Sequence, residues 1–174
     1  KNLCLRYGMD FEECRAWYDG YSFPNCPHVY SPKSVVDAMV KGRFGSYWNK
    51  TETYEALQVY IDLNEDGLRD AVVKMMGGGC QKINTGTFQN DMTTFTSADD
   101  VMTLLVHLGY LGYDGEQEEV FIPNNEVLQE YVNATKQGDD WQIVSQAVKA
   151  SDELLQAVFD GREADVASDV GAAH

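Results

Sequence analysis

The chain has 174 residues, a length that suits one domain or two small ones. It carries 28 acidic and 13 basic residues, and its net charge of −15 disfavours binding to the phosphate backbone of nucleic acids. Hydrophobic residues make up 44% of the chain, enough for a core. No apolar run approaches the roughly 20 residues that a membrane-spanning helix needs, so we expect no membrane contact.

The four cysteines are spaced too widely to predict a zinc site. They stand at positions 4, 14, 26 and 80, without a Cys-x-x-Cys pair. We expect reduced thiols and a cytoplasmic location. The chain begins at Lys1 within a helical pattern, and most side chains of residues 166–174 are small. We therefore expect a fragment of a longer protein.

The first 48 residues predict two helices separated by a loop. Asp10 can cap a helix that runs to about Trp17, and Asp19-Gly20 then ends it. Pro24 and Pro27 predict a loop over residues 23–28. Ser31-Pro32 is a strong helix start, because Ser caps and Pro suits the first turn, and this helix ends at Gly42.

The next stretch predicts two more helices and a polar segment. An aromatic connection over residues 44–48 leads to a helix that opens at Thr51 or Thr53. Another helix opens at Asp66 or Gly67 and stops at the glycine run 77–79. Alternation over residues 81–84 suits an edge strand or a loop.

Residues 97–136 predict a helix, a hairpin and a second helix. The capping signal Thr96-Ser97-Ala98-Asp99 opens the first helix, with Asp99 as the acid at the third position after a hydroxyl and Asp100 as an exposed acid. Gly109 ends this helix. Strands over 110–113 and 119–122 flank an Asp114-Gly115 turn, and Asn124 caps the next helix. This pattern resembles the helix-plus-wing half of a winged-helix fold. Two further helices are predicted within residues 141–160.

We find no residue set typical of catalysis, cofactor binding or metal binding. The glycine run 77–79 lacks the Gly-Lys-Ser/Thr ending of a phosphate-binding loop. His28 could titrate near neutrality, but Asp19 and Cys26 are its only candidate partners for a metal. Cys26 and His28 lack a third group that would orient them as a nucleophile and a base. Paired acids elsewhere stand at helix starts, in a turn and in a loop, where the helix dipole or solvation favours them.

A dense aromatic motif predicts a structural role. Because residues 16–30 contain no Lys or Arg, packing around a fixed turn is favoured over a base-stacking platform. We expect Trp17, Tyr21 and Tyr30 to be substantially buried, and Asp19 to accept hydrogen bonds. The residues of this motif are Trp17, Tyr18, Asp19, Gly20, Tyr21, Phe23, Tyr30 and Pro32.

Four segments in order carry a family resemblance. They are Trp-Tyr-Asp-Gly-Tyr-Ser-Phe at 17–23 with Val-Tyr-Ser-Pro-Lys-Ser-Val at 29–35, Tyr47-Trp48 within 44–48, Asp99-Asp100-Val101 and Leu108-Gly109-Tyr110-Leu111 within 95–111, and Ile-Pro-Asn-Asn-Glu-Val at 122–127. Together they resemble the predicted AAA-ATPase-like family of bacteria, whose members often carry a C-terminal nuclease-like domain of the PD-(D/E)XK superfamily.

The resemblance implies a place between two catalytic parts of a parent protein. The family's nucleotide-binding motifs lie upstream of these segments and its nuclease carboxylates downstream, so no catalytic residue carries over. ATP and magnesium are implied for the parent and not for this segment. Whether Arg6 or Arg15 reaches a nucleotide stays open.

We therefore predict an α+β fold, mostly α, in three parts. A helical lid-like region covers residues 1–79, a winged-helix-like region with one short β-hairpin covers 80–136, and C-terminal helices or a linker cover 137–174. The predicted function is a non-catalytic regulatory or interaction segment. Its partners are the rest of the parent chain, with self-association or a protein partner left open.

Two alternatives belong to other classes of protein. The first is a DNA-binding winged-helix module whose recognition helix includes Thr103 and His107. This helix has no Lys or Arg between Asp99 and Tyr113. The second is a small stand-alone enzyme, which a deep pocket with converging polar groups of perturbed pKa would support.

Overall fold

The structure is a computed structural model that describes residues 1–23, 25–48, 67–88 and 97–135. The chain divides into two compact units, 1–131 and 132–174, and the fold described is that of the first. The helix predicted from Thr51 or Thr53 and the helices predicted within 141–160 lie outside the described residues. The division into three regions stays a prediction.

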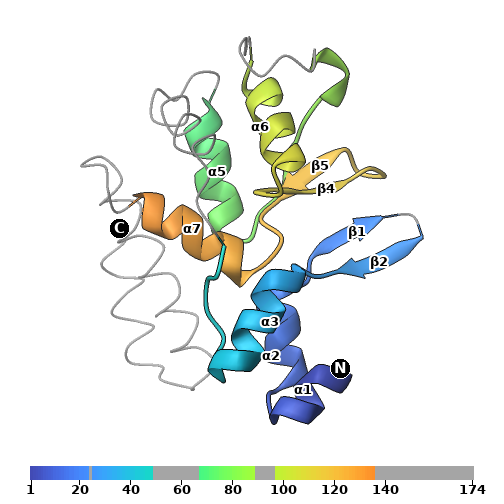
Figure 1. Ribbon diagram of the computed structural model, residues 1–174. Coiled ribbons are helices and arrows are strands. Elements are labelled where there is room, and N and C mark those ends of the chain that lie inside the picture. Colours follow the sequence, from blue (N-terminus) through green and yellow to red (C-terminus); the bar gives the residue numbers. More distant parts are fainter. Residues whose placement is uncertain (24, 49–66, 89–96, 136–174) are drawn as a thin grey trace, which may run out of the picture. The chain divides into compact units, whose positions relative to one another are not determined.

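The described residues form helices and short antiparallel strands, which confirms the α+β, mostly α class (Figure 1). No helix among them is long and apolar enough to cross a bilayer. The helices are α1 (Asn2–Tyr7), α2 (Phe11–Tyr18), α3 (Pro32–Lys41), α5 (Leu68–Met76), α6 (Ala98–His107) and α7 (Asn125–Thr135). The strands are β1 (Tyr21–Phe23), β2 (Cys26–Val29), β3 (Gln81–Lys82), β4 (Gly112–Asp114) and β5 (Glu119–Phe121), with a 3-10 turn at Thr85–Thr87.

Local capping fixes the starts of α2 and α3, as predicted. The Asp10 carboxylate accepts a 2.7 Å hydrogen bond from the Glu13 amide at the start of α2. The Ser31 hydroxyl accepts one from the Ser34 amide at the start of α3, whose first residue is Pro32. Gly42 ends α3 with φ at 64°, in the left-handed region that glycine adopts at little cost.

Helices α1, α2 and α3 contact one another around a small core. Tyr18 is fully buried in it, and its hydroxyl donates a 3.0 Å hydrogen bond to the Gly45 carbonyl. Trp17, Tyr21 and Tyr30, which were expected to be substantially buried, are each half-buried. Tyr18, not Trp17, is the aromatic anchor of α2.

The loop predicted over residues 23–28 is wrong, because Phe23 ends β1 and residues 26–28 belong to β2. Tyr21 pairs with Val29 and Phe23 with Cys26, with an irregular register between them. Proline lacks the N–H that a ladder bond needs, but a two-stranded sheet has only edge strands, which tolerate Pro27.

The remaining strands form a three-stranded antiparallel sheet in the order β3-β5-β4. Val120 of β5 pairs with Tyr113 of β4 on one side and with Gln81 of β3 on the other. The order α5, β3, α6, β4, β5 with this strand order is compatible with the winged-helix-like unit expected from the sequence, which stays a prediction. The structure thus contains two hairpins and a third paired strand, not one short hairpin.

The hairpin after α6 starts two residues later than predicted. The amides of Tyr110 and Leu111 both donate to the Leu105 carbonyl, so these residues close the helix and the strand begins at Gly112. The turn at Asp114 is confirmed, and its carboxylate accepts hydrogen bonds from the amides of Glu116 and Gln117.

The acids at the start of α6 exchange their predicted roles. Ser97 caps the helix, and its hydroxyl accepts from the Asp100 amide, so Asp100 and not Asp99 is the third helical residue. Asp100 is buried, whereas it was predicted to be exposed. The Asp99 carboxylate instead accepts a 3.0 Å hydrogen bond from the Asn84 amide.

Candidate functional site

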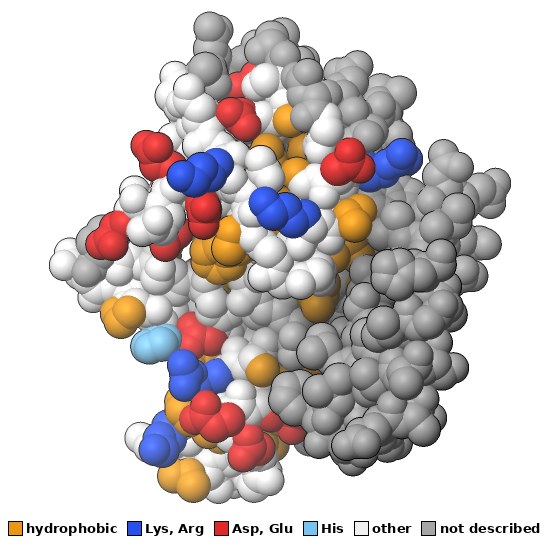
Figure 2. Space-filling view, turned by 180° about the vertical axis from the view of Figure 1, so that it is seen from behind, with side chains coloured by type: hydrophobic (Ala, Val, Ile, Leu, Met, Phe, Trp, Pro, Cys, Tyr) orange, Lys and Arg blue, Asp and Glu red, His pale blue; other side chains and the backbone are white. Residues whose placement is uncertain are grey.

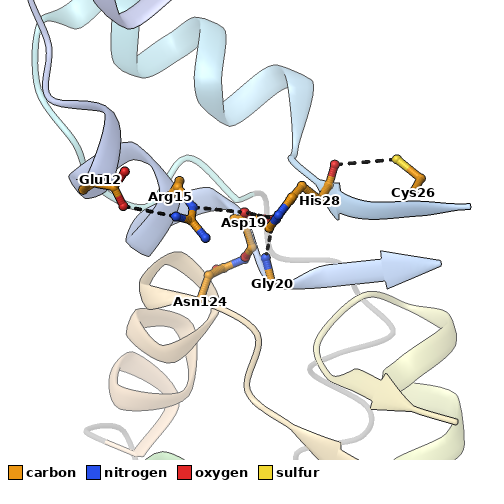
Figure 3. A network of polar contacts seen from close by, with 7 residues as sticks. All are labelled: Glu12, Arg15, Asp19, Gly20, Cys26, His28 and Asn124. Carbon is orange, nitrogen blue, oxygen red and sulfur yellow. Dashed lines mark hydrogen bonds and ion pairs between the residues drawn. The ribbon is translucent and has the colours of Figure 1, made fainter. Parts of the chain in front are cut away.

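Asp19 follows α2 directly and holds a network of donors (Figure 3). Its side chain is 10% exposed. Oδ1 accepts a 2.8 Å hydrogen bond from the Gly20 amide, and Oδ2 lies 2.8 Å from His28 Nδ1 and 3.7 Å from Arg15 Nε. The expectation that Asp19 accepts hydrogen bonds is confirmed.

Tyr30 adds a further donor to this carboxylate. Burial, and after it hydrogen bonding to Asp19, raises the pKa of Tyr30 to about 12. The phenol therefore stays protonated at neutral pH and donates to Asp19. A buried carboxylate that gathers several donors is a rigid connection between the end of α2 and the β1–β2 hairpin.

His28 is oriented by Asp19, which the sequence indicated only as a candidate partner for a metal. A carboxylate accepts from Nδ1, which places the proton on that nitrogen and leaves Nε2 of a neutral imidazole as an acceptor. Cys26 does not complete a nucleophile–base pair, since its thiol lies 3.7 Å from the His28 backbone carbonyl oxygen. Within the described residues, no group of three or more His, Cys, Asp or Glu side chains could hold a metal ion.

The same turn contacts the start of α7. The Asn124 side-chain amide donates a 2.9 Å hydrogen bond to the Asp19 backbone carbonyl, while its oxygen caps α7 through the Val127 amide. Gly20 has φ at 111°, and a Cβ placed there would lie 1.9 Å from the Pro123 carbonyl oxygen. Glycine is required at position 20 for its φ value and for this close backbone approach.

Tyr21 reaches the end of α6. Its hydroxyl donates a 2.6 Å hydrogen bond to the Gly109 carbonyl. Burial raises the pKa of Tyr21, so the hydroxyl remains a donor. The Trp48 ring lies close to Gly109 and packs edge-on against Tyr110, with ring centres 5.8 Å apart.

Two buried acids on α7 hold the aromatic connection. Glu126 accepts a 2.7 Å hydrogen bond from the Tyr47 amide, and Glu130 accepts a 2.6 Å bond from the Ser46 hydroxyl. Burial raises the pKa of Glu126, although hydrogen bonds from Tyr47, Ser34 and Trp48 oppose the shift. These residues were predicted only as parts of a helix and a connection.

The structure thus brings the four family-like segments to one place, which we call the junction: residues 19–21, 46–48, 109–110 and 123–126. Five residues of the predicted motif lie outside the junction: Trp17, Tyr18, Phe23, Tyr30 and Pro32. Phe23 is 63% exposed, and Pro32 is an exposed first residue of α3.

The helix predicted to contact DNA exposes few side chains that could do so. Thr103 is buried and donates its hydroxyl to the Asp99 carbonyl, whereas His107 is exposed and stacks on Phe88. The β4–β5 turn carries exposed acids at Asp114, Glu116 and Glu118. An acidic turn beside a mostly buried helix opposes contact with phosphates.

Comparisons of the chain with protein-family models, with curated proteins and with solved structures find no match. The functional argument therefore rests on the junction and on the surfaces beside it. The junction can position backbone segments precisely. Its polar atoms are largely engaged with one another.

Replacing Gly20 by Ala should destabilise the protein far more than the same change at Gly8. Gly8 also has a positive φ, 68°, but an added Cβ would meet nothing within 4 Å. Gly8→Ala therefore costs only the backbone strain, about 1–2 kcal/mol. Gly20→Ala adds a clash with backbone and should cost about 3 kcal/mol or more in the free energy of unfolding, measured by urea denaturation. Equal costs would contradict the close approach to Pro123.

Replacing Glu126 by Gln should flatten part of the pH dependence of stability. Since the folded-state pKa of Glu126 lies above its ordinary value of 4.5, the folded state binds more protons than the unfolded state. Its contribution is complete below pH 4.5 and is lost as the pH rises through the folded-state pKa. Urea denaturation across this range should show a wild-type decline that Glu126→Gln lacks and the exposed control Glu116→Gln retains. Parallel curves for wild type and Glu126→Gln would contradict the buried carboxylate.

Proposed function

We propose that the chain is a non-catalytic regulatory or interaction segment of a larger AAA-like ATPase. The observation that carries the proposal is the convergence of the four family-like segments at the junction. Its hydrogen bonds join residues 105, 88 and 79 positions apart, in the pairs Asn124–Asp19, Tyr21–Gly109 and Tyr47–Glu126. A packing constraint explains why motif residues that are so far apart in the sequence lie in contact.

The chemistry of the junction supports a role without catalysis. Tyr21, Asn124 and Glu126 each direct a polar group at a backbone atom. A side chain that satisfies a buried backbone group is committed to the fold and is costly to withdraw for a reaction. Such a site favours precise placement of neighbouring surfaces over turnover of a substrate.

The proposal assigns ATP and magnesium to the parent protein. The partners are the rest of the parent chain, with self-association or another protein as further possibilities, and the proposed location is the cytoplasm. All four cysteines are free thiols, which supports a reducing compartment. The acidic turn and the buried face of α6 support leaving nucleic acids out of this proposal.

A nucleotide-binding measurement tests the proposal directly. The chain, shown to be folded by its thermal unfolding transition, should give no saturable heat of binding with magnesium-ATP and should release no phosphate. We expect this because the described residues offer no phosphate-binding loop or metal cluster to hold the nucleotide. Tight ATP binding with hydrolysis by this chain would refute the proposal.

The flanking gene sequence gives an independent check. The proposal expects a phosphate-binding loop encoded upstream, followed by the four segments in the same order. A gene that encodes these segments with neither that loop upstream nor nuclease-type carboxylates downstream would contradict a parent ATPase of this family.

A further inference from the structure

Two buried cysteines meet between the first two helices. Cys4 lies in α1 and Cys14 in α2, and each is only 3% exposed within the core that also holds Tyr18. The Met9 amide donates a 2.9 Å hydrogen bond to the Cys4 carbonyl, which closes a tight turn after α1. This turn brings α1 and α2 into contact, and each cysteine stands five residues from Met9.

The two thiols interact with each other. Burial, and after it hydrogen bonding to Cys4, raises the pKa of Cys14 to about 12. Two thiols close enough to share a hydrogen bond can join as a disulfide without a large movement of the backbone. Both are free thiols in this structure. Where thiols are kept reduced, the disulfides that do form are mostly transient or redox-sensing.

A pocket gives a small reagent access to this pair. It has a volume of about 690 Å³ among α1, α2, α3 and the end of β2, and both cysteines line it. Leu3 and Val36 of its wall are exposed, so the pocket opens to solvent. Figure 2 shows apolar side chains reaching the surface between charged ones over the lower part of the molecule, where these helices lie. The volume is typical of pockets that accept a small molecule.

We propose that Cys4 and Cys14 are a reversible redox pair, which a low-molecular-weight disulfide such as oxidised glutathione converts into a disulfide within the chain. The new bond closes the turn over residues 4–14 and fastens α1 to α2. The oxidation state of the pair then sets how firmly the first helix is held. This chemistry is separate from the proposed function and does not depend on it.

Two thiol–disulfide exchanges carry out the oxidation. Because Cys14 holds its proton, the thiolate of Cys4 attacks one sulfur of oxidised glutathione. The glutathione S–S bond breaks, one glutathione takes up the Cys4 proton and leaves as a thiol, and the other stays bonded to Cys4. Cys14 then loses its proton and attacks the Cys4 sulfur, which releases the second glutathione as a thiol. Two electrons pass from the protein thiols to the glutathione disulfide, and an excess of reduced glutathione reverses both steps.

Mass spectrometry of a chain that keeps only this pair tests the proposal. Cys26→Ser and Cys80→Ser together remove the two exposed thiols. After incubation with oxidised glutathione, the folded chain should lose the mass of two hydrogen atoms and carry no glutathione. A chain that stays reduced, or that carries glutathione without losing this mass, would overturn the proposal.

Tryptic peptides locate the new bond. Trypsin cuts after Arg6 and Arg15, so it separates residues 2–6 from residues 7–15, and each of these peptides holds one cysteine of the pair. The oxidised chain should give the two peptides as one linked species, which a reducing agent resolves into its parts. Two separate peptides before reduction would overturn the proposal.

The fold, and not only the short spacing in the sequence, should favour the bond. In concentrated urea the same chain keeps the spacing of the two cysteines but loses the contact between α1 and α2. The equilibrium constant for the disulfide, measured in mixtures of reduced and oxidised glutathione, should be at least about tenfold larger for the folded chain. An equal or smaller constant for the folded chain would mean that the helices hold the two sulfurs apart, and would overturn the proposal.

A matched variant keeps the exposed thiols instead. Cys4→Ser with Cys14→Ser leaves Cys26 and Cys80, which should each take up glutathione and form no bond with each other. An equally complete bond in this variant would overturn the special role of the buried pair. If serine in the core prevents folding, the comparison with urea decides alone. Absence of the Cys4–Cys14 bond leaves the proposed function standing, whereas ATP hydrolysis by the chain refutes that function whatever the thiols do.

Discussion

The close backbone approach of Gly20 to Pro123 is the constraint on which the described structure depends. It requires glycine at a φ of 111°, and the Asn124 side chain then bonds the neighbouring Asp19 carbonyl. Asp19 faces both ways, since its carbonyl meets the start of α7 and its carboxylate orients the β1–β2 hairpin. One turn thus ties α2, the hairpin and α7 together.

The buried carboxylates have a common purpose in this arrangement. Folding removes the carboxylates of Asp19 and Glu126 from water. This costs free energy for a charged group unless hydrogen-bond donors surround it. Each is matched by backbone amides together with side-chain donors. Buried acids that accept several hydrogen bonds specify one arrangement of the segments they bind.

The sequence predicts the elements that are fixed by neighbouring residues. It misses the contacts between residues that lie far apart in the chain. The caps at Asp10, Ser31 and Asn124 act within three residues, so their helices are predicted correctly. The β1–β2 hairpin is missed because two prolines indicate a loop, while strand pairing tolerates Pro27 at an edge. The partners of Asp19 and Glu126 are 9 and 79 residues away, and no local spacing indicates them.

The central claim is that the junction makes residues 1–131 one cooperative unit. Native-state hydrogen exchange in increasing denaturant tests it most directly, because it measures the opening free energy of each amide. The account predicts that the core amides of α2, α3, α6 and α7 converge on one global opening. An opening of α2 and α3 at a distinctly lower free energy, while α6 and α7 stay protected, would contradict it.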